Sequence, residues 1–400
     1  MSFPPETAND RPAALEFFIV AGEISGDRLG AKLVQALRDR LGERVTFRGV
    51  GGDAMRAAGV DSLFPLEDIA VMGFLPVIAR LPQLLRRIRE TADAVIAKPP
   101  HALIIVDSPD FTHRVARKVR ARLPHLPVID YVSPSVWAWR PGRAAKMRAY
   151  VDHILALLPF EPRAHAELHG PACTYVGHPL IERLDELQPT TDDVRRRNAQ
   201  PPLLVVLPGS RRSEIARLLE TFGATLPLLR EKIGAFETVL PAVAYLESLI
   251  REKIANWPIR PDIVVGEDAK LKAFRQARGA LAASGTVTLE LGLAKTPVVV
   301  AYKVSAIEAA IARQLIRTNW ISLPNIILNE QVYPEFLQDK ANASALADKL
   351  ADIMKDTPAR ASQLAALDRL ASFMRLESDV TPSVKAASIV LDVVAGRAPA

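Results

Sequence analysis

Asp107 is a candidate general base that could accept the proton of a hydroxyl group. It ends an apolar run, Leu103–Asp107, that the sequence predicts as a strand, and Ser108 and Pro109 follow it. In open parallel sheets, ligands bind at the carboxyl ends of the strands. An aspartate is ordinarily ionised at neutral pH, so Asp107 can accept a proton there. A purely structural carboxylate is the alternative. Asp110 follows a proline and precedes a helical run, which predicts a helix N-cap.

A second turn has the composition of a phosphate-binding loop. Gly209, Ser210 and Arg211 follow the predicted strand Leu203–Leu207 and lead into apolar residues at helical spacing. A helix N-terminus binds anions, and an arginine adds a bidentate donor. The turn therefore suits the diphosphate of a nucleotide sugar. The sequence contains no GxxxxGK[ST] loop, which excludes an ATPase-type phosphate site.

A third turn repeats this logic. Ser284, Gly285 and Thr286 follow a predicted strand that ends at Ala283, and Glu290 lies one helical turn beyond Thr286. We expect the hydroxyls and the helix N-terminus to hold phosphate, and the Glu290 carboxylate to reach the two ribose hydroxyls. A solvent-facing helix position is the alternative for Glu290.

Two loops in the first half of the chain carry the candidate residues for the acceptor substrate. The loop after the first predicted strand contributes Gly22, Glu23, Ser25, Gly26 and Asp27. The loop after the fourth contributes Ser133, Ser135, Trp137 and Arg140. The glycine spacing differs from GxGxxG, which disfavours a dinucleotide cofactor. Aromatic faces bind sugar rings or acyl chains, and an arginine binds phosphate. Packing glycines and buried tryptophans are the alternatives.

An apolar segment followed by arginines is the candidate membrane contact. Within Val71–Ala79 the apolar patch comprises Val71, Met72, Phe74 and Leu75, and the basic stretch Arg80–Arg89 follows. This composition is typical of a surface that enters an anionic membrane, and an amphipathic core helix is the alternative. The apolar segment is too short to span a bilayer. The N-terminus lacks the apolar region of a secretory signal.

The elements that must position these turns alternate between strands and helices, which predicts parallel α/β sheets. The predicted strands are Leu15–Val20, Val45–Val50, Leu103–Asp107, Val128–Val132, Ile154–Leu158, Leu203–Leu207, Glu237–Leu240, Asp262–Val265, Gly279–Ala283 and Pro297–Tyr302. We expect two Rossmann-like domains facing a central cleft, joined by a polar linker over Glu182–Pro202. The expected boundaries are 1–190 for the acceptor and membrane-facing domain, 191–365 for the UDP-sugar-binding domain, and 366–400 for a C-terminal helix packing back on the first.

Composition agrees with two folded domains and an anionic partner. The chain has 400 residues, of which 49% are hydrophobic and 24% charged. Its net charge is +6 and its pI about 9.4, which favours an anionic membrane surface or nucleic acid. Because no nucleic-acid-binding motif occurs, we expect no nucleic-acid partner. The single cysteine, Cys173, fits a reducing cytoplasm. No D-x-D pair, HExxH or paired Cys/His spacing occurs, so we expect neither a metal nor a cofactor.

Several blocks together make the chain similar to the lipid-A-disaccharide synthases. They are AGEISGDRLG from Ala21, VMGF from Val71, DSPDF from Asp107, YVSPSVWAWR from Tyr131, LPFEP from Leu158, VGHPL from Val176, LPGSRRSE from Leu207, ASGTVTLE from Ala283 and SLPN from Ser322. The resemblance covers about Phe17 to Gln338, and the YVSPSVWAWR block is especially specific.

This resemblance implies a glycosyltransferase-B fold and an inverting transfer from UDP-2,3-diacylglucosamine to 2,3-diacylglucosamine 1-phosphate. In that scheme Asp107 is the base and Arg211 holds the UDP diphosphate. Asn325 and Glu335 would lie in the same nucleotide pocket, with Asn329 as the alternative to Glu335. The resemblance also implies a cytoplasmic enzyme bound peripherally to the inner membrane, with lipid-linked sugar substrates. A homodimer is one state to test.

Three other interpretations remain at this stage. The first is a different UDP-sugar glycosyltransferase or a UDP-sugar 2-epimerase on the same scaffold, which would not need the apolar and basic segments of Val71–Arg89. The second is a noncatalytic lipid-binding module, against which the intact residues Asp107, Arg211 and Glu290 argue. Nucleic-acid binding, suggested by the pI alone, is the third.

Overall fold

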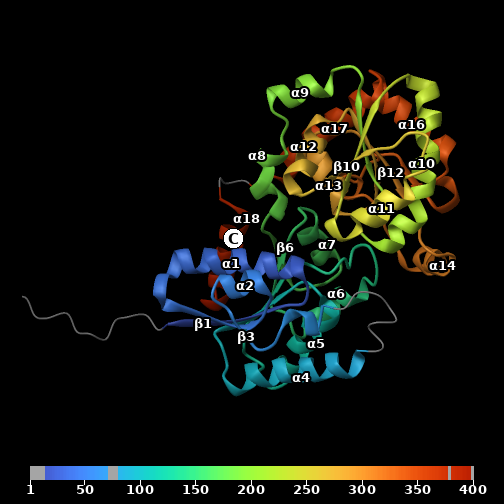
Figure 1. Cartoon of the computed structure of the whole chain (residues 1–400). Coiled ribbons are helices and arrows are strands. Elements are labelled where there is room, and N and C mark those ends of the chain that lie inside the picture. Colours follow the sequence, from blue (N-terminus) through green and yellow to red (C-terminus); the bar gives the residue numbers. More distant parts are fainter. Residues whose placement is uncertain (1–13, 71–79, 377–379, 398–400) are drawn as a thin grey trace, which may run out of the picture. The chain divides into compact units, whose positions relative to one another are not determined.

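The computed structural model describes residues 14–70, 80–376 and 380–397 (Figure 1). The chain divides into two compact units. The first unit comprises Met1–Pro179 together with Leu376–Ala400, and the second comprises Leu180–Arg375. Each unit is built on one parallel sheet.

The sheet of the first unit has seven strands in the order β3-β2-β1-β4-β5-β6-β7, and all neighbours are parallel. Its strands are β1 (Leu15–Ala21), β2 (Val45–Val50), β3 (Asp61–Ser62), β4 (Ala102–Val106), β5 (Val128–Tyr131), β6 (His153–Ala156) and β7 (Ala172–Tyr175). The central strands are buried on both faces, which explains why they are apolar throughout. Along β1, Phe17 and Ile19 enter one core and Phe18 and Val20 the other, because side chains alternate across a strand.

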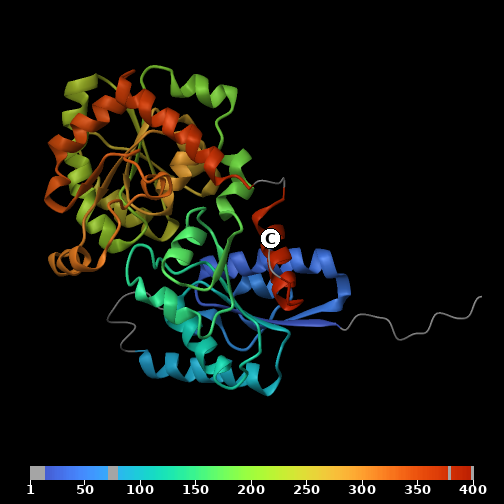
Figure 2. The same cartoon turned by 180° about the vertical axis from the view of Figure 1, so that it is seen from behind.

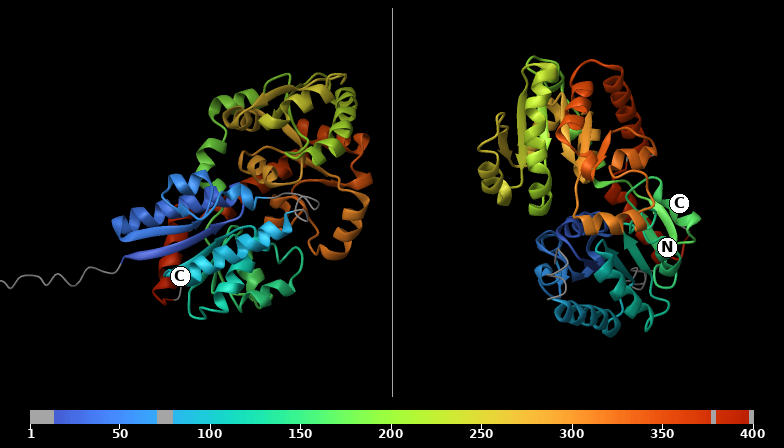
Figure 3. Two further views of the ribbon diagram at one scale, coloured as in Figure 1. Left: turned by 60° about the horizontal axis from the view of Figure 1, so that its bottom comes forward. Right: turned by 90° about the vertical axis from the view of Figure 1, so that its right-hand side faces the viewer.

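Helices cover both faces of this sheet. They are α1 (Ile24–Leu41), α2 (Asp53–Ala57), α4 (Leu81–Ala97), α5 (Pro109–Arg120), α6 (Gly142–Met147), α7 (Glu161–Glu167) and α18 (Pro382–Val394), with 3₁₀ helices at Gly42–Arg44 and Leu66–Asp68. Leu33 and Leu37 of α1 and Val390 of α18 share the core on one face. Val95 of α4 and Val115 of α5 enter the core on the other face. The C-terminal helix α18 thus lies alongside α1, near the start of the chain (Figures 1 and 3).

The sheet of the second unit has six parallel strands in the order β10-β9-β8-β11-β12-β13. Its strands are β8 (Leu203–Leu207), β9 (Glu237–Ala242), β10 (Asp262–Val265), β11 (Gly279–Ala283), β12 (Val298–Tyr302) and β13 (Glu335–Leu337). Phe222 of α10 (Arg212–Ile233) and Leu346 of α16 (Ala343–Met354) pack with Val206 and Leu281 of the sheet in one core. The two helices lie side by side (Figure 2).

The helices of the second unit are α8 (Leu184–Leu187), α9 (Thr191–Arg197), α10 (Arg212–Ile233), α11 (Glu247–Lys253), α12 (Glu267–Gln276), α13 (Thr286–Leu293), α14 (Ala306–Leu315), α15 (Leu323–Leu328), α16 (Ala343–Met354) and α17 (Pro358–Met374). Further 3₁₀ turns lie at Pro179–Arg183, Ala244–Leu246 and Gln338–Lys340. Helices α12 and α13 contact the sheet, and α17 packs on α13. No helix among the described residues is long and apolar enough to cross a membrane.

The structure corrects two sequence-based predictions about helix ends and linkers. Helix α5 begins at Pro109, so Asp110 lies in its first turn and Ser108 takes the N-cap position. The predicted linker Glu182–Pro202 is wrong, since it contains helices α8 and α9. Buried Arg197 donates hydrogen bonds to the carbonyl oxygens of Arg275 and Lys295, at 2.6 and 2.8 Å. The polar residues of this segment therefore anchor it to the second unit.

All ten predicted strands are present, with ends that shift by up to two residues. Three short strands, β3, β7 and β13, escaped prediction because each has only two to four residues. Strand β4 ends at Val106, one residue before Asp107. That single-residue difference places Asp107 in the turn rather than in the sheet.

Candidate active site

Asp107 lies in a sharp turn between β4 and α5. Both Asp107 and Ser108 have left-handed backbones, with φ of 56° and 45°, which non-glycine residues rarely adopt. The Ser108 amide donates a hydrogen bond to Asp107 Oδ1 at 2.7 Å, and Thr112 Oγ1 donates one to the Asp107 carbonyl at 2.7 Å. The Ser25 hydroxyl lies 3.5 Å from Asp107 Oδ2. Such strain persists where surrounding bonds enforce it, often at active sites.

Gly22, in the β1–α1 loop, and Gly26, in the first turn of α1, allow close packing against the Asp107 turn. A Cβ on Gly22 would lie 2.3 Å from the Cβ of Ser108, a distance that real Cβ atoms do not show. A Cβ on Gly26 would lie 3.1 Å from the Val106 carbonyl oxygen and 3.6 Å from the Asp107 Cβ. The structure therefore brings the predicted glycines against the Asp107 turn, in a packing role.

An apolar cavity of about 720 Å³ adjoins the Asp107 turn. We call it the apolar cavity. Its polar edge is formed by Glu23 and Ser25 at the start of α1 and by Ser108 and Asp110 at the start of α5. Its walls are mostly apolar side chains of α4, α5 and their neighbours: Ile24, Ile69, Leu81, Leu84, Leu85, Ile88 and Phe111. Ile24, Leu81 and Leu85 are exposed. A cavity of this lining fits a hydrocarbon chain next to a polar head group.

Asp27 lies in the first turn of α1 and has a structural role. Its carboxylate is buried and accepts hydrogen bonds from the amides of Gly52, Ala54 and Met55 at 2.7, 3.0 and 3.0 Å. It thus satisfies the first amides of α2, which have no partner within the helix. Asp27 therefore ties the first turn of α1 to the start of α2, and it does not line the apolar cavity.

The aromatic loop Tyr131–Arg140 is anchored from within the first unit. Buried Ser133 contacts His165 Nε2 at 2.8 Å through its hydroxyl. The Trp137 indole donates a hydrogen bond to Glu161 Oε1 at 3.2 Å and packs edge-to-face on Phe160, with ring centroids 5.0 Å apart. For these side chains the structure favours the loop-anchoring interpretation. Ser135 and Arg140 are exposed and remain available to a ligand.

Glu161 is the buried carboxyl that holds this loop. It accepts hydrogen bonds from the amides of Leu157 and Leu158, at 3.1 and 2.9 Å, as well as from Trp137. Burial raises the pKa of Glu161 to about 7, and these hydrogen bonds only partly oppose the rise. Sequence reasoning did not single out Glu161, although the Leu158–Pro162 block contained it.

A second cavity, of about 580 Å³, lies in the second unit at the carboxyl edge of its sheet. We call it the nucleotide cavity. Gly209, Ser210, Arg211, Ser284, Gly285, Thr286 and Glu290, all predicted from the sequence, line it together. Helices α10, α12 and α13 begin at its wall, since their first residues or N-caps are among the lining residues. Three helix N-termini give the cavity a positive potential suited to phosphate.

The Gly209 turn requires glycine for two reasons. Its φ is +118°, and a Cβ there would meet the Glu214 carboxylate at 2.4 Å. Glu214 Oε2 accepts hydrogen bonds from the amides of Ser210 and Arg211, at 2.9 and 3.3 Å. Glu214 Oε1 lies 3.0 Å from the Arg211 guanidinium, which is mostly exposed. Glu214 therefore shapes the loop while leaving Arg211 accessible to a ligand.

Glu290 is paired with a cation that sequence reasoning missed. Lys270 Nζ lies 3.0 Å from Glu290 Oε1 and also contacts Glu267 at 3.0 Å. The sequence did contain a signal for Lys270, because this residue falls in the first turn of the helix that follows the predicted strand Asp262–Val265. Ser284 points its hydroxyl to the Ile321 carbonyl at 2.7 Å. Lys270 thus holds the Glu290 carboxylate at the wall of the nucleotide cavity, and its own charge is balanced by Glu290 and Glu267.

Asn325 and Glu335 come together with each other but do not line the nucleotide cavity. The Asn325 amide is fully buried and donates to the Tyr333 carbonyl and to Glu335, at 2.9 and 2.8 Å. Glu335 also accepts from the amides of Ile321 and Ser322, at 3.0 and 2.8 Å. These two side chains hold the segment around Ile321, whose carbonyl accepts the hydrogen bond from Ser284. They therefore support the wall of the nucleotide cavity without contacting its interior.

The apolar patch Val71, Met72, Phe74 and Leu75 lies outside the described residues. Residues 14–70, 80–376 and 380–397 contain no group of three or more His, Cys, Asp or Glu side chains that could hold a metal ion. Cys173 is a free cysteine, and burial raises the pKa of its thiol well above the usual range.

The comparison with known proteins now decides the family. The family model described as lipid-A-disaccharide synthetase matches residues 17–386. The chain belongs to this family. Family members from two bacteria illustrate the similarity. The lipid-A-disaccharide synthase of Nitrobacter hamburgensis is 54% identical over 383 residues, covering 96% of each chain. That of Nitrobacter winogradskyi is 53% identical over 390 residues, covering 98% of each chain.

Solved structures share the fold at low sequence identity. A UDP-GlcNAc 2-epimerase from Neisseria meningitidis aligns with a TM-score of 0.59 at 11% identity, covering 96% of this chain and all of that one. Phytolacca americana UGT2, solved with UDP-2-fluoro-glucose and pterostilbene, aligns with a TM-score of 0.60 at 14% identity, covering 95% of this chain and all of that one. These likenesses establish the two-domain α/β fold of glycosyltransferase-B type, whereas the family match separates this chain from the epimerases.

Proposed function

We propose that this chain joins UDP-2,3-diacylglucosamine to 2,3-diacylglucosamine 1-phosphate. The products are the β-1,6-linked disaccharide 1-phosphate and UDP. The observation that carries the proposal is the family match over residues 17–386, which contains both the Asp107 turn and the Arg211 turn. Each turn lies at the carboxyl edge of its own sheet, where α/β proteins bind ligands.

In the proposed mechanism Asp107 takes the proton of the acceptor 6-hydroxyl. The hydroxyl oxygen forms a bond to the anomeric carbon of the donor, on the face opposite to UDP. The bond between that carbon and the phosphate oxygen breaks, and UDP leaves with the bonding electron pair. One displacement inverts the anomeric centre. The hydrogen bond from the Ser108 amide and the nearby Ser25 hydroxyl orient the Asp107 carboxylate for this task.

The second unit would hold the donor and stabilise the leaving UDP. Negative charge develops on the diphosphate as the bond breaks, and preorganised positive groups lower the barrier for such a step. Arg211 and the N-termini of α10, α12 and α13 supply that charge around the nucleotide cavity. We assign Glu290 to the ribose hydroxyls, with Lys270 fixing its carboxylate. The proposal involves no cofactor, because the UDP-sugar is a substrate.

A turnover assay tests this function directly. Purified chain is incubated with UDP-2,3-diacylglucosamine and 2,3-diacylglucosamine 1-phosphate in detergent, and the disaccharide and UDP are quantified by mass spectrometry. We expect stoichiometric release of both, and no product when UDP-GlcNAc replaces the acylated donor. Preferential use of UDP-GlcNAc, or its epimerisation at carbon 2, would overturn the proposal in favour of a soluble-sugar enzyme.

We further propose that the chain works at the cytoplasmic face of the inner membrane as a peripheral protein. The exposed apolar residues Leu81 and Leu85 support this, because they lie just after the segment Val71–Ala79 and line the apolar cavity. Replacing Met72, Phe74 and Leu75 by serine should reduce flotation with phosphatidylglycerol vesicles, and unchanged flotation would refute the membrane assignment. Sedimentation equilibrium in detergent would test the predicted homodimer.

A further inference from the structure

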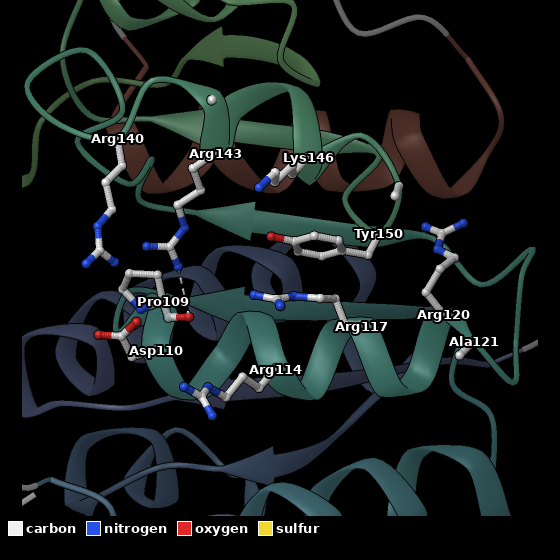
Figure 4. A pocket seen from close by; sticks show the side chains of 12 residues that line it. Pro109, Asp110, Arg114, Arg117, Arg120, Ala121, Arg140, Arg143, Lys146 and Tyr150 are labelled. Atoms are coloured by element: carbon white, nitrogen blue, oxygen red, sulfur yellow. Dashed lines mark hydrogen bonds between the residues drawn. The ribbon is translucent and has the colours of Figure 1, made fainter.

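The first unit contains a third cavity, of about 920 Å³, whose wall is dominated by cations. We call it the arginine cavity. It lies between α5, Tyr150 and the segment that runs from Arg140 through α6 (Figure 4). Its cationic lining side chains are Arg114, Arg117, Arg120, Arg140, Arg143 and Lys146. Figure 4 shows Arg140 and Arg143 pointing toward Pro109 and Asp110 at the start of α5, and Arg117 extending beneath the Tyr150 ring.

This concentration of positive charge is largely uncompensated. Six cationic side chains line the cavity, against one carboxylate, Asp110. Arg120 is neutralised by its ion pair with Asp152. In the described part of the chain, no carboxylate forms an ion pair with Arg117, Arg143 or the remaining cations of this wall. An uncompensated cluster repels itself unless an anion binds, so it favours an anionic ligand.

Protein contacts pre-orient several of these guanidinium groups. The Arg143 guanidinium donates a hydrogen bond to the Pro109 carbonyl at 3.1 Å. Arg117 lies over the Tyr150 ring, 5.1 Å from its centroid, and Arg140 lies 4.4 Å from that of Trp139. These contacts limit the conformations of the side chains but leave most of their N–H donors unused. Arginines held in this way bind phosphate with little loss of side-chain entropy.

The arginine cavity adjoins the apolar cavity beside Asp107. Pro109, Asp110 and Arg114 line both cavities, and all three follow within seven residues of Asp107. An anion-binding cavity and a hydrocarbon-binding cavity therefore share one wall next to the proposed base. A ligand that suits both must carry apolar chains and a phosphate close together.

We propose that the arginine cavity binds the phosphomonoester of the acceptor, with Arg117, Arg143 and Lys146 as its principal contacts. The inference rests on the proposed function, which makes the acceptor a diacylated sugar 1-phosphate. A phosphomonoester carries almost two negative charges at neutral pH and accepts several hydrogen bonds, which suits converging arginines. Its acyl chains occupy the apolar cavity, while the donor diphosphate has a separate site on Arg211. The arginine cavity thus selects a phosphorylated acceptor.

The test compares two double variants that lose the same charge. Arg117→Gln with Arg143→Gln removes two cations of the arginine cavity. Lys118→Gln with Arg148→Gln is the matched control, because both residues are exposed, lie on or next to α5 and α6, and do not line the cavity. Lys146→Gln serves as a single variant whose side chain makes no hydrogen bond in the described structure. Thermal unfolding checks that all variants fold.

Kinetics with the wild-type chain should show a strong preference for the acceptor with the 1-phosphate over the same diacylated sugar with a free 1-hydroxyl. In the cavity variant we expect the KM for the phosphorylated acceptor to rise about 10- to 100-fold, as for loss of charge-assisted hydrogen bonds. The KM for the UDP-sugar should not change. The control should behave as wild type, and Lys146→Gln should show a smaller rise in the same direction. An unchanged acceptor KM in both cavity variants would overturn the inference.

Two further measurements distinguish this inference from the proposed reaction and from binding of lipid headgroups. Equilibrium binding of a short-chain 2,3-diacylglucosamine 1-phosphate, measured without donor, reports on the cavity even if no turnover occurs. Tighter binding of this ligand than of its dephosphorylated form, lost in the cavity variant, supports the inference independently of the reaction. Flotation with phosphatidylglycerol vesicles tests the other source of phosphate. If the cavity variant loses vesicle binding but keeps its preference for phosphorylated acceptor, the cavity binds lipid headgroups and the inference is wrong.

Discussion

Glu161 offers a quantitative test of how the aromatic loop is held. Its carboxyl is buried among the amides of Leu157 and Leu158 and the indole of Trp137. Replacing it by glutamine keeps the size of the side chain and removes its titration. The perturbation therefore isolates the effect of the buried charge on the first unit.

The size of the effect follows from the shift in pKa. The pKa of Glu161 is 4.5 as a reference for the unfolded chain and about 7 in the folded chain, because burial disfavours the ionised form. The folded state therefore binds the proton more tightly, so this stabilisation is fully present below pH 4.5 and is lost as pH rises through about 7. At about 1.4 kcal/mol per pKa unit, the first unit should lose roughly 2.5 kcal/mol from this group between about pH 5 and pH 8.

Hydrogen exchange by mass spectrometry is the suitable assay, because it reports the opening free energy of each unit separately. Peptides covering β4 to β6 are compared at the two pH values after correction for intrinsic exchange rates. In Glu161→Gln we expect the loss of stability on raising the pH to shrink by about 2.5 kcal/mol relative to wild type. Glu167→Gln is the control, since Glu167 is on the same helix but its side chain is 62% exposed.

The comparison of pH slopes cancels the general cost of the substitution. The glutamine carbonyl can still accept from the Leu157 and Leu158 amides, but its NH2 group cannot accept the hydrogen bond from the Trp137 indole, so the variant will be less stable at low pH as well. Only the dependence on pH bears on the buried charge. If wild type and Glu161→Gln lose the same stability between the two pH values, Glu161 is ionised throughout and the argument from burial fails.

The remaining predictions concern the two turns of the proposed active site. Asp107→Asn should lower kcat about 10²- to 10⁴-fold with unchanged UDP affinity in calorimetry, and normal turnover would remove Asp107 from the mechanism. Arg211→Ala should weaken UDP binding at least about tenfold, and an unaltered dissociation constant would contradict the diphosphate assignment. Gly209→Ala forces a Cβ to within 2.4 Å of Glu214 at a φ of 118°, so we expect roughly 1–3 kcal/mol of destabilisation in thermal unfolding; an unchanged midpoint would argue against it. Lys270→Met should weaken UDP binding less than Arg211→Ala does, and equal or greater loss would reverse their ranking.

The fold was largely predictable because its strands are buried on both faces. Runs such as Leu203–Leu207 are apolar throughout, and only a parallel sheet covered by helices buries such a run completely. Short edge strands such as β13 carry too few residues to form a pattern. The segment around Arg197 misled prediction because arginine is usually exposed, whereas here its guanidinium satisfies buried carbonyl oxygens.

The candidate site was also predictable only in part. Turns rich in glycine, serine and arginine after strands were recognisable because their composition suits close backbone approach and anion binding. The partners of their side chains were not recognisable. Asn325 donates a hydrogen bond to Glu335, and Asp27 accepts hydrogen bonds from the first amides of α2. Such hydrogen bonds form between residues that are separated along the chain, so the local sequence does not reveal them.

By itself, the sequence determined two parallel α/β sheets, the turns that bear Asp107 and Arg211, and the family. These features follow from local composition and from the order of motifs along the chain. Tertiary structure alone decided that Asp107 adopts a left-handed turn, that Lys270 pairs with Glu290, and that arginines of α5 and α6 line one cavity. Helical spacing places Arg117 on a face of α5, but only packing of α6 beside it brings Arg143 to the same cavity. The physical reason is that charge density and strain arise from juxtaposition in space, which the linear spacing of residues does not encode.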